Sequence, residues 1–100
     1  MLKFITYSED KKQDLKDVIC YLQTKGSKLG NPMNEPTANS IAVLNLVPEQ
    51  LYTKYAYYVI LYAYQRGMFK AHEKGSVIPF ITMQSAKEVV KKAFEQTCHG

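Results

Sequence analysis

The side chains best suited to chemistry are four carboxylates near the start of the chain: Glu9, Asp10, Asp14 and Asp17. On a helix, Asp10 and Asp14 lie one turn apart, as do Asp14 and Asp17, and such pairs could hold a cation. Lysines alternate with these acids, namely Lys11, Lys12 and Lys16. An exposed face of balanced charge is therefore the simpler interpretation of the cluster.

The cysteine and histidine residues do not form a pattern that indicates a catalytic or metal site. Cys20 lies in an apolar pattern that is typical of a small core residue. Cys98 and His99 are adjacent, but a structural or catalytic zinc site needs four ligands, or three and a water. His72 is remote from them in the sequence. We expect no metal site and no cofactor.

Signatures of catalysis are also missing from the sequence. The stretch "GSKLGN" contains a lysine but lacks the spacing and the ending of a phosphate-binding loop. The sequence contains no Gly-x-Ser-x-Gly and no His-Glu-x-x-His. We therefore expect a protein that binds and is not an enzyme.

The most unusual stretch is "YAYYVILYAY" at positions 55–64, which has no charge, no glycine and no proline. It follows Pro48, a residue favoured at helix starts, and continues without a breaker to Gly67, so we predict a helix. A strand at 57–64 is the competing interpretation, because aromatic and β-branched residues favour sheets. On a helix, apolar groups cover nearly the whole circumference, which indicates burial on more than one side.

A domain of 100 residues has little chain with which to cover such a helix. Tyrosine is enriched at protein interfaces. We therefore predict that the helix mediates a homodimer or the binding of a protein target. The predicted interface residues are Tyr57, Ile60, Leu61, Tyr64 and Phe69.

Nucleic-acid binding is the alternative. The net charge is +4 and the isoelectric point is about 9.0. Aromatic side chains that stack on bases, combined with cations that meet phosphates, suit single-stranded nucleic acid. The candidate contacts are Lys54, Arg66, Lys70, Lys74, Lys87, Lys91 and Lys92.

The remaining patterns predict the elements around this helix. Residues 2–7 and 76–83 favour strands, and Pro79 would bend the second of these or put it at an edge. An apolar run at 40–47 is typical of a strand that is covered on both faces. Apolar residues at helical spacing predict a helix from about Glu9 to Thr24, and Ser85 with Glu88 predicts a capping box for a last helix.

Strands and helices thus alternate along a single domain of 1–100. The predicted fold is α/β, with a three-stranded sheet and three helices in βαβαβα order and with crossover connections. Prolines, glycines and asparagines predict a long flexible loop at 26–39, between the first helix and the second strand. A frayed tail is expected at 97–100.

One segment, "DLKDVICYLQTKGSKLG" at 14–30, resembles the first helix and following turn of plasmid-mobilisation relaxases. In that family a tyrosine near the end of the helix cuts DNA, and the resemblance would give this role to Tyr21. The histidine cluster that binds the metal in relaxases has no counterpart here, so the activity is not carried over.

The sequence shows no signal peptide, and the tyrosine run is about half the length that crosses a bilayer. We expect a cytoplasmic protein that does not enter a membrane. Its small size suits an inhibitor or accessory factor of phage or plasmid type.

Overall fold

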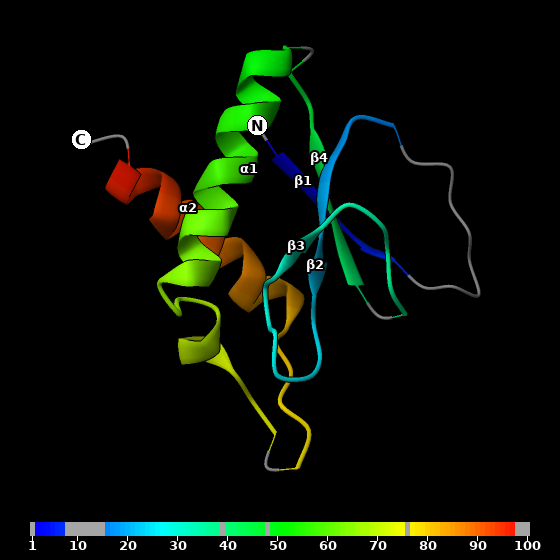
Figure 1. Ribbon diagram of the computed structural model, residues 1–100, viewed down its shortest axis with the longest axis vertical. Helices are drawn as coiled ribbons and strands as arrows, with labels where there is room; N and C mark the ends of the chain where they lie inside the picture. The colour runs from blue at the N-terminus through cyan, green and yellow to red at the C-terminus, as the bar shows by residue number, and fades with distance from the viewer. Residues whose placement is uncertain (1, 8–15, 39, 48, 76, 98–100) are drawn as a thin grey trace.

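The computed structural model describes residues 2–7, 16–38, 40–47, 49–75 and 77–97. Four strands in this part of the chain form one sheet: β1 (Leu2–Tyr7), β2 (Val18–Gln23), β3 (Pro32–Met33) and β4 (Ser40–Asn45). The helices are α1 (Gln50–Gln65), α2 (Met83–Thr97) and the short 3-10 turn η1 (Lys70–His72). Both α-helices pack against the same face of the sheet (Figure 1).

The sheet is antiparallel throughout, in the order β1-β4-β2-β3. The predicted βαβαβα order is therefore wrong, because the first three connections join strands without an intervening described helix. The strand predicted at 40–47 is confirmed as β4, but it is one of the two inner strands of an antiparallel sheet. All six of its residues are buried. Its continuous apolar pattern reflects this position between two long strands, under the helices on one face.

The helix predicted from Glu9 to Thr24 is wrong where the structure describes it, because β2 occupies residues 18–23. Residues 8–15, with Glu9, Asp10 and Asp14, lie outside the described residues. The pairing of β2 with β4 shifts register between Val18 and Cys20. A β-bulge of this kind puts consecutive residues on one face, and Ile19 and Cys20 both join the core. The bulge breaks strict alternation and makes the spacing of apolar residues look helical.

The segment predicted as a loop at 26–39 contains the strand β3 in its described part. Pro32 pairs with Leu22 and Met33 with Tyr21, which makes β3 a short second edge of the sheet. The turn before it is closed by a hydrogen bond from the amide of Gly30 to the carbonyl oxygen of Gln23, at 2.8 Å.

The long tyrosine helix is confirmed as α1. Its N-cap, Glu49, makes no side-chain capping bond. The start of the helix is instead tied to the end of β4 by buried Asn45, whose Nδ2 donates to Thr53 Oγ1 at 2.7 Å. The Oδ1 of Asn45 accepts a hydrogen bond from the amide of Val47 at 2.8 Å. These bonds satisfy a buried amide and fix the angle between strand and helix.

The strand predicted at 76–83 is also wrong where the structure describes it. Among residues 77–83, Phe80 alone forms bridges, with Lys25 and with Lys74. The carbonyl oxygen of Pro79 accepts a hydrogen bond from Gly26 at 2.9 Å, so the segment is attached to the turn after β2. Pro79 itself has no amide hydrogen to donate to a ladder, which agrees with the short pairing.

The last helix is confirmed, but it begins earlier than predicted. Thr82 caps it, because the amide of Ser85 donates to Thr82 Oγ1 at 3.1 Å. The predicted capping box between Ser85 and Glu88 is therefore wrong, because the cap lies three residues earlier and Ser85 is a buried residue of α2.

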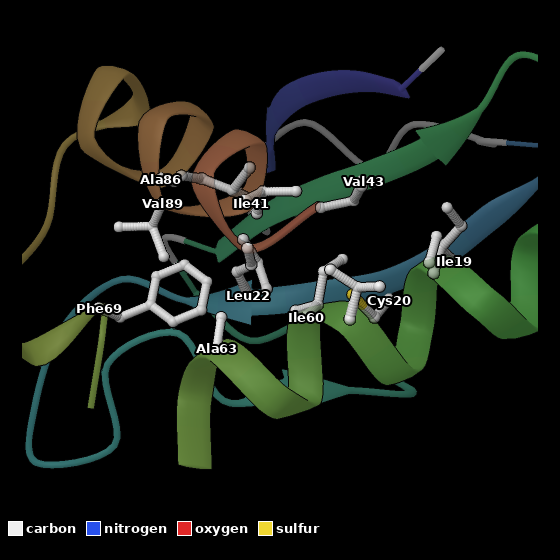
Figure 2. Close-up of a cluster of buried hydrophobic side chains, with 14 of the residues drawn as sticks. Ile19, Cys20, Leu22, Ile41, Val43, Ile60, Ala63, Phe69, Ala86 and Val89 are labelled. Carbon is white, nitrogen blue, oxygen red and sulfur yellow. The ribbon is translucent and has the colours of Figure 1, made fainter. Parts of the chain in front are cut away.

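The core lies between the sheet and the two helices (Figure 2). Two small residues of α1, Ala56 and Ala63, let this helix approach β2 closely. Ile60 fills the space between the helix and the strand. Phe69, which follows α1, closes the end of the core and is 1% exposed.

Candidate protein-binding surfaces

The outer face of α1 carries three exposed large side chains at helical spacing. Leu51 is 75% exposed, Tyr58 is 65% exposed and Tyr55 is 40% exposed. These positions are separated by four and three residues, so they form one stripe. We call Leu51, Tyr55 and Tyr58 the α1 stripe.

Neighbouring contacts hold both tyrosines of the stripe in defined orientations. Tyr55 meets the ring of Phe94 edge to face, with centroids 5.5 Å apart, and its hydroxyl lies 3.0 Å from Thr97 Oγ1. Tyr58 meets Tyr57 edge to face at 5.9 Å. Side chains that are held in this way lose little further entropy when a partner covers them.

A hollow of about 360 Å³ lies where α1, α2 and β1 meet. Its apolar lining comes from all three elements: Leu2, Phe4, Tyr52, Val90 and Phe94. Three charged residues complete its lining: Lys87, Lys91 and Glu95. We call this hollow the β1–α2 groove.

The structure separates the five predicted interface residues into two groups. Ile60 and Phe69 are buried in the core, at 0% and 1% exposure, and present no surface to a partner. Tyr57, Leu61 and Tyr64 are half-buried. Tyr57 and Tyr64 pack against the core cluster.

The members of the α1 stripe were missed as interface residues, although the sequence held a signal for them. The helical wheel puts Leu51, Tyr55 and Tyr58 on one side. Ala56 and Ala63 lie on the face that the structure buries. Small residues allow close packing of a helix on a sheet, so alanines mark the inner face, and the large residues opposite them stay outside.

All seven predicted nucleic-acid contacts are exposed. Five of them line four different hollows: Lys70 one, Lys54 a second, Lys87 and Lys91 a third, and Lys92 a fourth. Arg66 lies over the ring of Tyr62, 5.8 Å from its centroid. The cations are thus distributed around the molecule, and nucleic-acid binding through them stays a prediction.

Tyr21, which the relaxase resemblance would make a nucleophile, lies in β2 and not at the end of a helix. Its ring meets that of Tyr7 edge to face at 5.8 Å. Burial of the ring, and then the neighbouring Tyr7, raise the pKa of Tyr21. This is opposite to the shift that activates a nucleophile, since the raised pKa disfavours the phenolate.

Cys20 is similarly unsuited to chemistry. Burial raises the pKa of its thiol to about 12, and it is a free thiol packed in the core. Within residues that the structure describes, no three histidine, cysteine, aspartate or glutamate side chains come together as a metal site. Cys98 and His99 lie outside these residues.

Among the described helices, none combines the length and the apolar character needed to cross a membrane. The longest, α1, has 16 residues.

The fold is a two-layer α/β sandwich with an antiparallel sheet. The chain belongs to a family of unknown function, DUF6943, whose model matches residues 4–100. No curated protein matches the chain, and no solved structure does.

Proposed function

We propose that this protein is a small interaction protein that binds and modulates a protein target and self-associates through the α1 stripe. The observation that carries the proposal is the exposure of Leu51 and Tyr58 on one face of a helix whose other face is fully packed. In this role the protein has no catalysis of its own and acts as an inhibitor or accessory factor. A cytoplasmic location suits the reduced thiol of Cys20.

Energetics support self-association. Burying a large apolar side chain contributes about 1.5–3 kcal/mol. In a two-fold symmetric dimer each residue of the α1 stripe is buried twice, once in each copy. The free energy gained by burying these side chains in both copies offsets the cost of bringing two molecules together, which is at least about 4 kcal/mol.

The surface beside the stripe also has a shape that suits a partner. A hollow of about 340 Å³ lies next to Tyr58, and Ile19, Asn34 and Lys54 are among its lining residues. A protruding ring next to a recess allows two surfaces to interlock. The single charged group in this hollow, Lys54, stays at the rim of the contact, where interfaces are polar.

A dilution series followed by NMR tests the proposal. If the α1 stripe forms the dimer, the side-chain resonances of Leu51, Tyr55 and Tyr58 shift with protein concentration. Resonances of the buried Ile60 and Ala63, on the opposite face of the same helix, serve as the control and stay constant. Spectra that do not change with concentration, or changes that map to another face, would refute self-association through this stripe.

A further inference from the structure

The sheet has one long edge. β1 lies at the end of the strand order and pairs with β4 along all six of its residues. No strand in the described part of the chain pairs with its other side. The opposite edge, β3, has only two residues. A six-residue edge presents backbone amides and carbonyl oxygens that can accept a further strand.

The β1–α2 groove lies directly beside this edge. Leu2 and Phe4 of β1 form one wall, and Val90 and Phe94 of α2 form the other. Side chains of an added strand alternate between the two faces of the sheet. Every second side chain of a strand added to β1 would therefore point toward this apolar groove, as in other cases of strand addition.

Charge near the edge decides what kind of strand fits. Lys87 and Lys91 lie one helical turn apart on α2 and both line the groove. Lys3 of β1 is exposed at the same edge, on the face of the sheet opposite to Leu2 and Phe4. Glu95 is the one acid in the groove, and it stands one turn beyond Lys91. The edge therefore favours a partner that carries carboxylates.

A second copy of this chain fits the edge poorly. Pairing of β1 with β1 of another copy about a two-fold axis would put Lys87 and Lys91 of both copies on the same side of the joined sheet. The four ammonium groups would then lie on one face of the dimer, beside the paired β1 strands. Like charges at an interface oppose association.

We propose that the β1 edge and the β1–α2 groove bind an extended, acidic segment of a protein partner, in which pairs of apolar and pairs of carboxylate side chains alternate, so that each face of the segment carries both kinds. The inference rests on the proposed function, because it assumes that the target is a protein. Backbone hydrogen bonds to β1 hold the segment. On the side that faces α2, apolar side chains enter the groove and a carboxylate meets Lys87 and Lys91. On the opposite side, a carboxylate meets Lys3.

Fluorescence anisotropy with synthetic peptides tests this. The probe is a labelled peptide of roughly six residues, the length of an ordinary strand, with valine and glutamate in alternating pairs. A peptide with lysine in place of glutamate tests charge. A valine–glutamate peptide that is N-methylated at alternate residues tests backbone pairing, because methylation removes the amide hydrogens.

The full-length protein should bind the glutamate peptide and not the lysine or N-methylated peptides. The double variant Lys87→Glu/Lys91→Glu should weaken binding by about tenfold or more and should gain affinity for the lysine peptide. Lys92→Glu is the matched control, since Lys92 is an exposed lysine on the same helix that lines a different hollow. It should leave binding unchanged.

Four results would overturn the proposal. Absence of binding, or equal loss in Lys92→Glu, would show that the groove lysines do not select the peptide. Binding that survives N-methylation would show that the groove takes an apolar anion without strand addition. A fall in the mass of the self-associated protein caused by Lys87→Glu/Lys91→Glu would make the edge a self-association surface. The mass of the wild-type protein is measured separately, so failure of the edge is distinguishable from failure of the proposed function.

Discussion

The rings of Tyr57 and Tyr58 meet edge to face, with centroids 5.9 Å apart and planes at 80°, although the two side chains have different surroundings. Tyr57 packs against the core cluster. Tyr58 is 65% exposed. Of these two adjacent residues, Tyr57 therefore contributes to the packing of the fold, and Tyr58 belongs to the surface that we propose for self-association.

Substitutions at these two positions should therefore have different effects. Tyr57→Ser removes contacts with the core and should lower the free energy of unfolding by about 1.5–3 kcal/mol. Tyr58→Ser should change it by less than about 0.5 kcal/mol but weaken the dimer by about tenfold or more, because the ring is buried on association. Urea unfolding and sedimentation velocity measure the two quantities. Equal effects of both variants on unfolding would contradict this division.

Packing of Phe69 depends on a glycine in the turn before β3. Gly30 has φ +80°, and a Cβ at this position would overlap the Phe69 ring. Gly30→Ala should lower the free energy of unfolding by about 2–4 kcal/mol, from backbone strain and steric overlap together.

The control for this prediction is Gly67→Ala. Gly67 has a similar φ of +73°, but a Cβ there would meet nothing within 4 Å. Gly67→Ala should therefore lower the free energy of unfolding only by the cost of backbone strain, about 1–2 kcal/mol. If thermal or urea unfolding gives the same loss for both variants, the close contact between Gly30 and Phe69 is not present in solution.

The buried thiol predicts a pH dependence of stability. The pKa of Cys20 rises from 9.0 to about 12 on folding, so above pH 9 the unfolded chain releases a proton that the folded chain keeps. Cys20 therefore favours the folded state fully below pH 9, and this contribution is lost as the pH rises toward 12.

Comparison of wild type with Cys20→Ala isolates this effect, since both proteins share all other titrating groups. The difference in their free energies of unfolding should be constant below pH 9 and should shrink above it. A difference that stays constant up to pH 11 would mean that Cys20 is not buried as described.

The sequence patterns predicted the helices better than the sheet. The central helix and the last helix were correct because uninterrupted length and an apolar stripe are local properties. β2 was mistaken for a helix because its bulge puts Ile19 and Cys20 on the same face, and a bulge depends on pairing with a strand that is distant in sequence. The segment around Pro79 has strand-like composition, but among its described residues it pairs only through Phe80.

The candidate surface was only partly predictable for a related reason. The sequence shows that α1 has more apolar circumference than one contact can cover, but not which side meets the sheet. Contacts with β2 and with Phe94 of α2 determine this, and they bury Ile60 and leave Tyr58 outside. The β1–α2 groove brings together residues from both ends of the chain, which no local pattern connects.

Sedimentation equilibrium of the wild-type protein over a wide range of concentration tests the central claim most directly. The chain has a mass of 11.4 kDa. We expect the measured mass to rise with concentration to twice this value, and to stay at one chain for the double variant Leu51→Ser/Tyr58→Ser. A wild-type mass of one chain at the highest concentration would contradict self-association through α1.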